Sequence, residues 1–191
     1  MGRFIGIDLG TTNSVIAIVD MGGSKVLHNR ENEQQTRSMV GFNKGDFLVG
    51  TPTVRRWALA PKDTIFSIKR LMGRAVSDPE VEKVKQNKWV QYEIVEPTDG
   101  TRDSIRVKVD GKEYSPVDIS AMILRKLKED AERTLGEDVT HAVITVPAYF
   151  SEKQCNATRE AGLKAGFTVM QILDEPTAAA IAFGISSKGQ E

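Results

Sequence analysis

Three short apolar segments near the start of the chain predict three neighbouring β-strands. They cover residues 4–7, 15–19 and 25–27, and the stretches between them, DLGTTNS and DMGGS, have turn-forming compositions. Because the connections are short, we expect an antiparallel meander. The first two segments are continuously apolar rather than alternating, which favours a sheet that is covered on both faces.

From residue 115 onward, helical and strand patterns alternate along the chain. Ser115 with Pro116 is a typical helix start and Gly136 a typical helix end, and one apolar stripe runs between them. The next segment, HAVITV, predicts a fully buried strand that ends at Pro147. The stripe consists of Ile119, Met122, Ile123, Leu127, Ala131 and Leu135.

The rest of this region predicts a helix, a strand and a further helix. Ser151 and Gln154 form a capping box for a helix that stops at Gly166. VMQIL predicts a second buried strand, and DEPTAAAIAFG predicts a helix that starts near Pro176 and ends at Gly184. Strands connected through helices cross over right-handedly and pair in parallel, so we expect parallel pairing here.

The middle of the chain, from about residue 40 to residue 114, has a different texture of short helices and hairpins. DPEVEKVKQ begins with Asp78 as a predicted N-cap, and SIRVKVDGKEY alternates in polarity and then turns at Asp110-Gly111. We therefore predict an α/β protein in two parts. Residues 1–39 and 115–191 form a core subdomain, and residues 40–114 form an inserted α+β subdomain.

Composition narrows the possible partners and the compartment. The 191 residues include 26 basic and 26 acidic side chains, and this formal net charge of zero argues against nucleic acid or an anionic membrane as a partner. A single cysteine, Cys155, rules out an internal disulfide framework and fits a reducing compartment. With no secretory signal and no membrane-spanning apolar stretch in the sequence, we expect a cytoplasmic protein.

The candidate chemistry begins at Asp8, where the first apolar segment ends. In helix-flanked sheets, ligands bind outside the carboxyl ends of the strands. Gly10 allows a tight turn, so the amides of Gly10, Thr11 and Thr12 can point into one concavity that suits phosphate oxygens. A carboxylate beside a phosphate needs a divalent cation between them, so Asp8 fits a Mg²⁺ ligand, directly or through water. The alternative interpretation is an ordinary hairpin turn.

Two further charged positions are candidates. In IFSIKRLMG, Lys69 and Arg70 interrupt an apolar helical stripe, and the alternative to a functional role is a solvated basic pair near a helix C-terminus. In DEPTAAA, Glu175 ends a buried strand and begins a helix, where the helix dipole alone favours a carboxylate.

Together, GIDLGTTNS, TIFSIKRLMG, VITVPAYF and DEPTAAAIAFG, in this order, closely resemble the DnaK family, the seventy-kilodalton heat-shock chaperones. The resemblance runs from residue 1 to about residue 184. It implies the first lobe of an actin-like, ribonuclease H-like ATPase domain, with a mixed five-stranded sheet flanked by helices and an inserted subdomain.

The resemblance also implies residue roles. Asp8 and Glu175 would hold Mg²⁺ through water, and Gly10, Thr11, Thr12 and Asn13 would contact the phosphates of ATP or ADP. Lys69 would reach the γ-phosphate and the attacking water, so the implied catalytic residues are Lys69, Glu175, Asp8 and Thr11. Pro147 would act as an allosteric switch, and K⁺ is an additional candidate cofactor.

This chain departs from the family pattern at four positions. Cys155 and Gln171 stand where the family usually has arginines that relay the ATP signal to the peptide-binding domain. Asp174 replaces an asparagine, and Arg37 replaces a proline. The resemblance implies that ATP chemistry is retained, whereas the absence of both arginines weakens the inference of the usual interdomain coupling and fits a divergent paralogue. We interpret Cys155 as an ordinary helix residue rather than a redox centre or nucleophile.

The implied partners are unfolded polypeptide clients, a J-domain co-chaperone and a nucleotide exchange factor. No second phosphate loop follows Glu175, so we expect a fragment that folds as one lobe, binds ATP weakly and hydrolyses it hardly at all. Two alternatives stay open: a lobe of a sugar or acetate kinase with the same fold, and a non-enzymatic actin-like scaffold protein.

Overall fold

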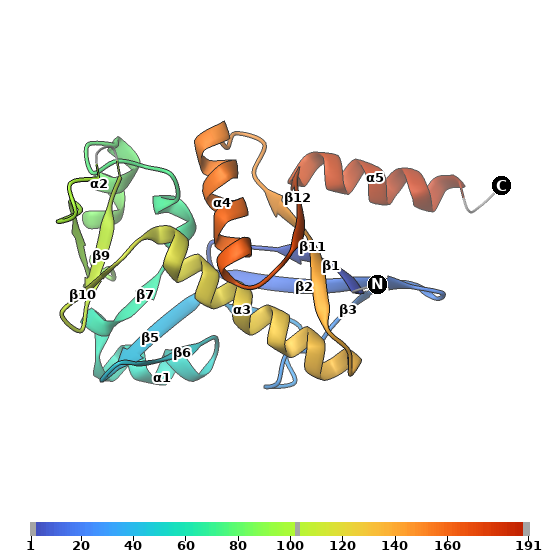
Figure 1. The fold of residues 1–191 in the computed structure, drawn as a ribbon, viewed down its shortest axis with the longest axis horizontal. Helices are drawn as coiled ribbons and strands as arrows, with labels where there is room; N and C mark the ends of the chain where they lie inside the picture. The colour runs from blue at the N-terminus through green and yellow to red at the C-terminus, as the bar shows by residue number, and fades with distance from the viewer. Residues whose placement is uncertain (1–2, 102–103, 189–191) are drawn as a thin grey trace.

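The structure is a computed structural model that describes residues 3–101 and 104–188. A mixed sheet forms its centre, with strand order β12–β11–β1–β2–β3, and a short strand, β4, pairs with β2 beside this row (Figure 1). Strands β1, β2 and β3 form the predicted antiparallel meander, and β11 pairs in parallel with both β1 and β12, as predicted. The strands are β1 (Arg3–Asp8), β2 (Asn13–Asp20), β3 (Gly23–Val26), β4 (Thr36–Arg37), β11 (Val139–Val146) and β12 (Val169–Asp174).

Among the described residues, only one face of this sheet is covered. Ile5 of β1 and Ile144 of β11 are buried in one core cluster with residues of helix α3 (Pro116–Leu135), whereas Phe4 keeps 60% of its surface exposed. The prediction that the sheet is covered on both faces was therefore wrong. The prediction that β11 and β12 are fully buried was also wrong, because Gln171 of β12 is exposed. Apolar side chains alternate between the two faces of a strand, and helices α3 and α4 pack on one of them.

The predicted helix boundaries in this half of the chain are confirmed at their caps. The hydroxyl of Ser115 accepts a hydrogen bond from the amide of Asp118 at the start of α3, and Gly136 ends the helix in the left-handed conformation with φ of 70°. Helix α4 (Glu152–Lys164) begins with the predicted capping box of Ser151 and Gln154. These side chains satisfy amides that the first helical turn leaves without partners.

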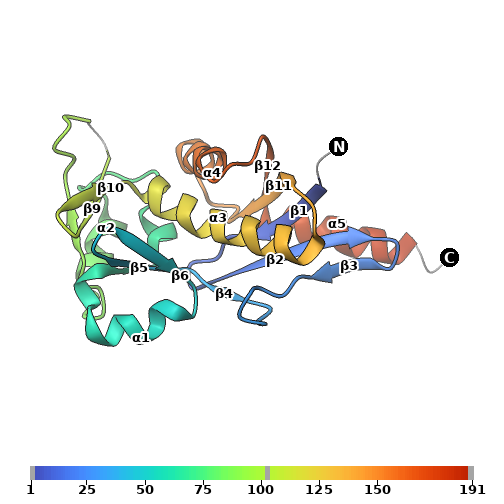
Figure 2. The same ribbon diagram turned by 60° about the horizontal axis from the view of Figure 1, so that its bottom comes forward.

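Helix α5 (Glu175–Lys188) continues past Gly184, where the sequence predicted its end. A glycine inside a helix costs only about 1 kcal/mol relative to alanine, so it weakens a helix without ending it. The helix projects from the sheet at the opposite end of the molecule from the small sheets of residues 40–114 (Figures 1 and 2). Its apolar side chains are exposed, Ile181 to 49% and Phe183 to 77%.

The middle of the chain forms two three-stranded sheets, β6–β5–β7 and β10–β9–β8. Asp78 caps α2 as predicted, since its carboxylate accepts from the amide of Glu80. The predicted hairpin at Asp110-Gly111 is also confirmed, with positive φ at both central residues, as a type I′ turn requires. The elements are β5 (Met39–Asn43), β6 (Asp46–Val49), α1 (Pro52–Leu59), β7 (Thr64–Phe66), α2 (Pro79–Lys85), β8 (Glu93–Val95), β9 (Arg106–Val109) and β10 (Lys112–Tyr114).

The division into a core and an inserted subdomain stays a prediction. Helix α3 packs against strands of both proposed parts, because it contacts β11 and β2 as well as β5 and β10. One continuous core cluster includes Ile144 of the large sheet, Val40 of β5 and Val107 of β9.

A buried ionic cluster joins the loop after β3 to helix α3. The Asp130 carboxylate, fully buried, accepts from Arg30 Nε at 2.6 Å and from Lys126 Nζ at 2.6 Å. Lys126 also contacts Glu31 at 2.8 Å, and Glu129 contacts Arg30 at 3.1 Å from a half-exposed position. Charges taken out of water need such partners, so the cluster fixes the position of this loop.

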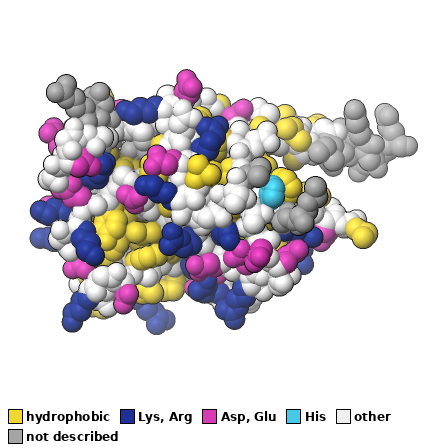
Figure 3. Space-filling model, in the orientation of Figure 1, with side chains coloured by type: hydrophobic (Ala, Val, Ile, Leu, Met, Phe, Trp, Pro, Cys, Tyr) yellow, Lys and Arg dark blue, Asp and Glu magenta, His cyan; other side chains and the backbone are white. Residues whose placement is uncertain are grey.

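The surface carries both charge signs. On the face seen in Figure 3, basic and acidic side chains are intermixed, in keeping with the formal net charge of zero. Within residues 3–101 and 104–188, no helix combines the length and the apolar character that crossing a bilayer would require.

Candidate functional site

Asp8 and Glu175 lie at the same edge of the sheet. Asp8 is the last residue of β1 and pairs with Thr145 of β11, and Thr145 pairs in turn with Leu173 of β12. The three strands are parallel, so their carboxyl ends meet at one edge, where helix-flanked sheets bind ligands. Glu175 follows β12 directly as the first residue of α5.

The turn after Asp8 has a shape that only glycine permits at its centre. A Cβ atom on Gly10 would lie 2.0 Å from the carbonyl oxygen of Asn13, so any side chain would force the turn to change. The segment around Ser38 stabilises this turn, because the amide of Ser38 donates a hydrogen bond to the carbonyl of Thr12 at 2.8 Å. The buried hydroxyls of Ser14 and Ser38 form a further hydrogen bond at 3.0 Å.

The Asp8 carboxylate has no hydrogen-bond or ion-pair partner among the described residues, and the residue is exposed. The same part of the chain contains no group of three or more His, Cys, Asp or Glu side chains that could hold a metal ion by themselves. Mg²⁺ usually keeps several waters and takes one or two carboxylates together with phosphate oxygens. The residues at this edge fit such a water-mediated site.

Lys69 points into the same region from a distant part of the chain. Its Nζ atom lies 3.1 Å from Oε1 of Glu175, and only 10% of its side chain is exposed. The ammonium group also lies 5.7 Å from the centre of the Phe150 ring. For Lys69, the interpretation as a solvated surface cation is therefore wrong, whereas Arg70 is exposed.

The segment that carries Lys69 is not the single helix that the apolar stripe suggested. Residues 64–66 form strand β7, and the 3₁₀ helix η2 (Ile68–Leu71) follows it. Ser67 between them has φ of 56°, a left-handed conformation that breaks helical continuity. The turn directs Lys69 inward and leaves Arg70 outside.

Tyr92 contacts the residue before this turn, Phe66, and no sequence signal indicated this contact. Its hydroxyl donates to the carbonyl oxygen of Phe66 at 2.7 Å, and their rings meet edge to face with centroids 5.9 Å apart. Burial raises the pKa of Tyr92, so its hydroxyl keeps the proton that it donates. Tyr92 lies in a segment without clear periodicity, so only the structure connects it to Lys69.

Asp174, the residue that departs from the family's asparagine, has a local role. Its carboxylate accepts from the amide and from the hydroxyl of Thr177, at 2.8 and 2.7 Å. The hydroxyl of Thr177 and then its amide lower the pKa of Asp174. This contact ties the end of β12 to the first turn of α5, and therefore orients Glu175 between them.

Three further sequence candidates occupy defined positions. Pro147 is buried directly after β11, where its carbonyl accepts from the amide of Phe150 at 3.0 Å. Cys155 is a partly buried residue of α4, and Gln171 is exposed on β12. Arg37 pairs with Asn13 across β4 and β2, next to the glycine turn after Asp8.

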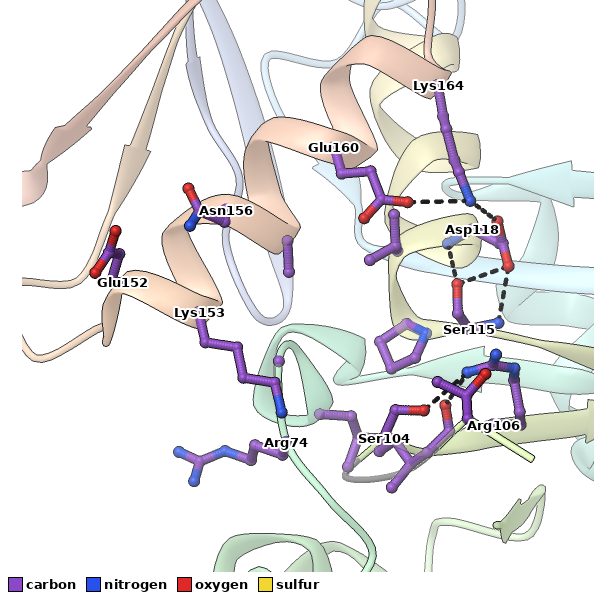
Figure 4. Close-up of a pocket in the computed structure, with 17 residues that line it drawn as sticks. Arg74, Ser104, Arg106, Ser115, Asp118, Glu152, Lys153, Asn156, Glu160 and Lys164 are labelled. Atoms are coloured by element: carbon purple, nitrogen blue, oxygen red, sulfur yellow. Dashed lines mark hydrogen bonds and ion pairs between the residues drawn. The ribbon is translucent and has the colours of Figure 1, made fainter. Parts of the chain in front are cut away.

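A large cavity lies elsewhere, between α4, the start of α3 and strand β9. It measures about 730 Å³ and is lined by none of the candidate nucleotide residues. Several of its polar groups pair with each other: Lys164 contacts Asp118 and Glu160, and Asp118 accepts from Ser115 (Figure 4). Burial opposes the shift, but these hydrogen bonds hold the pKa of Asp118 below its ordinary value, so its carboxylate stays charged at neutral pH.

Comparison with known protein families and sequences adds independent information. The family model described as Hsp70 protein matches residues 4–191. Proteins named Chaperone protein DnaK from two strains of Thermus thermophilus are each 51% identical over 191 residues. The match covers 100% of this chain and 30% of each relative, so the chain spans about a third of the length of these curated proteins.

Proposed function

The chain belongs to the Hsp70 protein family, and on this premise we propose that it forms the phosphate-binding lobe of an ATP-hydrolysing, DnaK-type chaperone. The family has the actin-like ATPase fold, and the mixed sheet and helices described above agree with it. No observation favours the kinase or scaffold alternatives.

The single observation that carries the proposal is the ion pair between Lys69 and Glu175. These residues are 106 positions apart in the chain, and their side chains meet at 3.1 Å. Lys69 lines one small cavity with Gly10 and a second with Thr11, so the pair lies beside the glycine turn. A buried lysine that contacts a carboxylate and lines cavities with Gly10 and Thr11 suits a phosphate whose charge increases during a reaction.

In this proposal the turn after β1 binds the phosphates. The amides of Gly10, Thr11 and Thr12 point toward the β- and γ-phosphates, and Asn13 contacts them from the start of β2. Asp8 and Glu175 would hold Mg²⁺ through water, and the ion would supply charge neutralisation at the phosphates. The fit rests on the Asp8 carboxylate, which has no partner within residues 3–101 and 104–188, and on the missing Cβ of Gly10.

Lys69 and Glu175 then serve hydrolysis by positioning and by charge. A water oxygen forms a bond to the γ-phosphorus while the bond from that phosphorus to the bridging oxygen breaks. ADP leaves with the electron pair of that bond, and both protons of the water end on the phosphate product, H₂PO₄⁻, from which one can pass to solvent. Glu175 accepts a hydrogen bond from the attacking water and orients it. Lys69 donates to a γ-phosphate oxygen, where negative charge is stabilised in the transition state.

The wider roles belong to the same proposal. ATP, ADP, Mg²⁺ and K⁺ are its cofactors, Pro147 is its nucleotide-state switch, and its partners are polypeptide clients, a J-domain co-chaperone and a nucleotide exchange factor. The names of the Thermus relatives, Chaperone protein DnaK, support the chaperone role. The cytoplasm as its location rests on the single cysteine of the chain.

Substitution at the glycine turn tests the proposal. We expect Gly10→Ala to abolish measurable Mg-ADP binding by isothermal titration, because the added Cβ would lie 2.0 Å from the carbonyl oxygen of Asn13. Gly6→Ala, on the preceding strand β1, is the matched control, since its Cβ would meet its nearest atom, the oxygen of Ala17, at an ordinary 3.8 Å. Equal affinity in both variants would exclude the turn as the phosphate site.

A further inference from the structure

Lys69 also lines a second cavity, which is distinct from the small cavity lined by Gly10. It measures about 490 Å³, and its lining includes Thr11, Lys69, Arg70 and Arg74. Thr11 and Lys69 are also the residues assigned above to the γ-phosphate. The cavity therefore begins where hydrolysis would produce inorganic phosphate.

Charge in this cavity favours an anion. Lys69, Arg70 and Arg74 line it, against one carboxylate, Glu80. The hydrogen bond from Lys83 lowers the pKa of Glu80 and pairs its charge, so this carboxylate repels an anion less than a free one would. Guanidinium groups are the side chains that match phosphate oxygens best, because their planar donors bind two oxygens at once.

Several donors around the cavity are not used by the protein itself. Arg70 is exposed and has no hydrogen-bond or ion-pair partner among the described residues. Arg74 uses Nη1 for Asp78 at 2.7 Å, but its Nε atom is buried without a partner in the described part of the chain. Figure 4 shows the Arg74 guanidinium directed away from Asp118 and Lys164 of the larger cavity.

Gln154 provides an independent observation in the same wall. It is only 7% exposed, and its Oε1 atom accepts from the amide of Ser151 in the capping box. That contact fixes the amide group, and its Nε2 atom is left buried with no partner within residues 3–101 and 104–188. Buried donors are normally satisfied, so Nε2 of Gln154 is available to donate to an anion or to an ordered water in this cavity.

We propose that this cavity is a holding site for inorganic phosphate after its release from ATP. The inference rests on the proposed function, because hydrolysis supplies the phosphate beside Lys69. Arg70 binds the phosphate from the solvent side and Arg74 from the inner side.

The test is a titration of the isotope-labelled chain with inorganic phosphate, followed by amide NMR, with Mg-ADP titrated separately. We expect phosphate to shift the amides of residues 68–74 and of Gln154 with a dissociation constant on the order of millimolar. Arg70→Gln should weaken phosphate binding about tenfold, the loss expected for one charge-assisted contact, and leave Mg-ADP affinity unchanged. Arg133→Gln is the control, because Arg133 is exposed on α3 and loses the same charge.

Three outcomes would overturn the inference: phosphate shifts none of these amides, Arg133→Gln weakens binding as much as Arg70→Gln, or binding depends on Lys69 and not on Arg70. The third result would mean that phosphate occupies only the γ position. A different result would count against the proposed function: the chain would bind phosphate in this cavity but would not bind Mg-ADP.

Discussion

Replacing Lys69 with methionine is expected to lower the rate of ATP hydrolysis by about 10²- to 10³-fold, the usual cost of removing one preorganised charge at a transition state. Methionine preserves most of the length and the apolar contacts of the lysine stem, including those beside Phe150, and removes the ammonium group. Glu175 would then lose the cation that lies 3.1 Å away in the present structure.

The assay for this variant is single-turnover hydrolysis in a chimera. Residues 1–191 replace the matching region of the Thermus thermophilus chaperone, because they span only 30% of that relative. ADP affinity should change little, since Lys69 is assigned to the γ-phosphate, which ADP lacks. Lys25→Met, on the exposed strand β3, is the control. An unchanged hydrolysis rate for Lys69→Met would remove Lys69 from the mechanism.

Replacing Asp130 with asparagine is expected to destabilise the fold by about 3–5 kcal/mol, because it breaks a buried ionic cluster by removing one partner. Arg30 and Lys126 would keep their charges while the carboxylate that contacts both at 2.6 Å is lost. The Lys126 side chain is 9% exposed, so water cannot compensate fully. Urea unfolding measures the change in the free energy of unfolding. The two proteins can be compared as two-state folders if the slope of that free energy against urea concentration is the same for both.

The neighbouring residue provides a control for this prediction. Glu129 also contacts Arg30, at 3.1 Å, but its side chain is 52% exposed. Glu129→Gln should therefore cost less than about 1 kcal/mol, as exposed ion pairs usually do. Similar losses for both variants would show that burial of Asp130 does not control the stability of the cluster.

Local signals in the sequence were sufficient to predict most of the elements around the site. The caps at Asp78, Ser115 and Ser151 and the turn at Asp110-Gly111 depend on side chains within a few residues, and all are confirmed. The short loops and the crossovers were enough to predict an antiparallel meander and parallel pairing, and the family resemblance joined them into one mixed sheet. These features were predictable because their causes lie within the segments themselves.

Features that depend on distant parts of the chain could not be predicted in this way. The apolar stripe around Lys69 was consistent with a helix, and only the left-handed Ser67 separates β7 from η2. The contact of Tyr92 with Phe66 joins residues 26 positions apart. The continuous apolar run of β1 indicated strands correctly, but it could not indicate which face the described helices cover.

The candidate site shows the same division. A carboxylate at a strand end and a glycine turn were visible as a local motif, which alone did not distinguish a phosphate site from a hairpin. Family resemblance, rather than periodicity, connected Lys69 and Glu175 to that motif. The structure then places their side chains 3.1 Å apart. Nothing in the sequence pointed to a shared role for Arg70, Arg74 and Gln154, because they come together only in the folded chain.

Amide NMR of the 191-residue chain during titration with Mg-ATP tests the central claim most directly, because each residue reports separately. The account predicts that the largest shifts fall on Gly10, Thr11, Thr12 and Asn13, with a second group around Lys69 and Glu175 across the same edge of the sheet. Shifts concentrated in the large cavity between α4 and β9, with the turn after Asp8 unchanged, would contradict it.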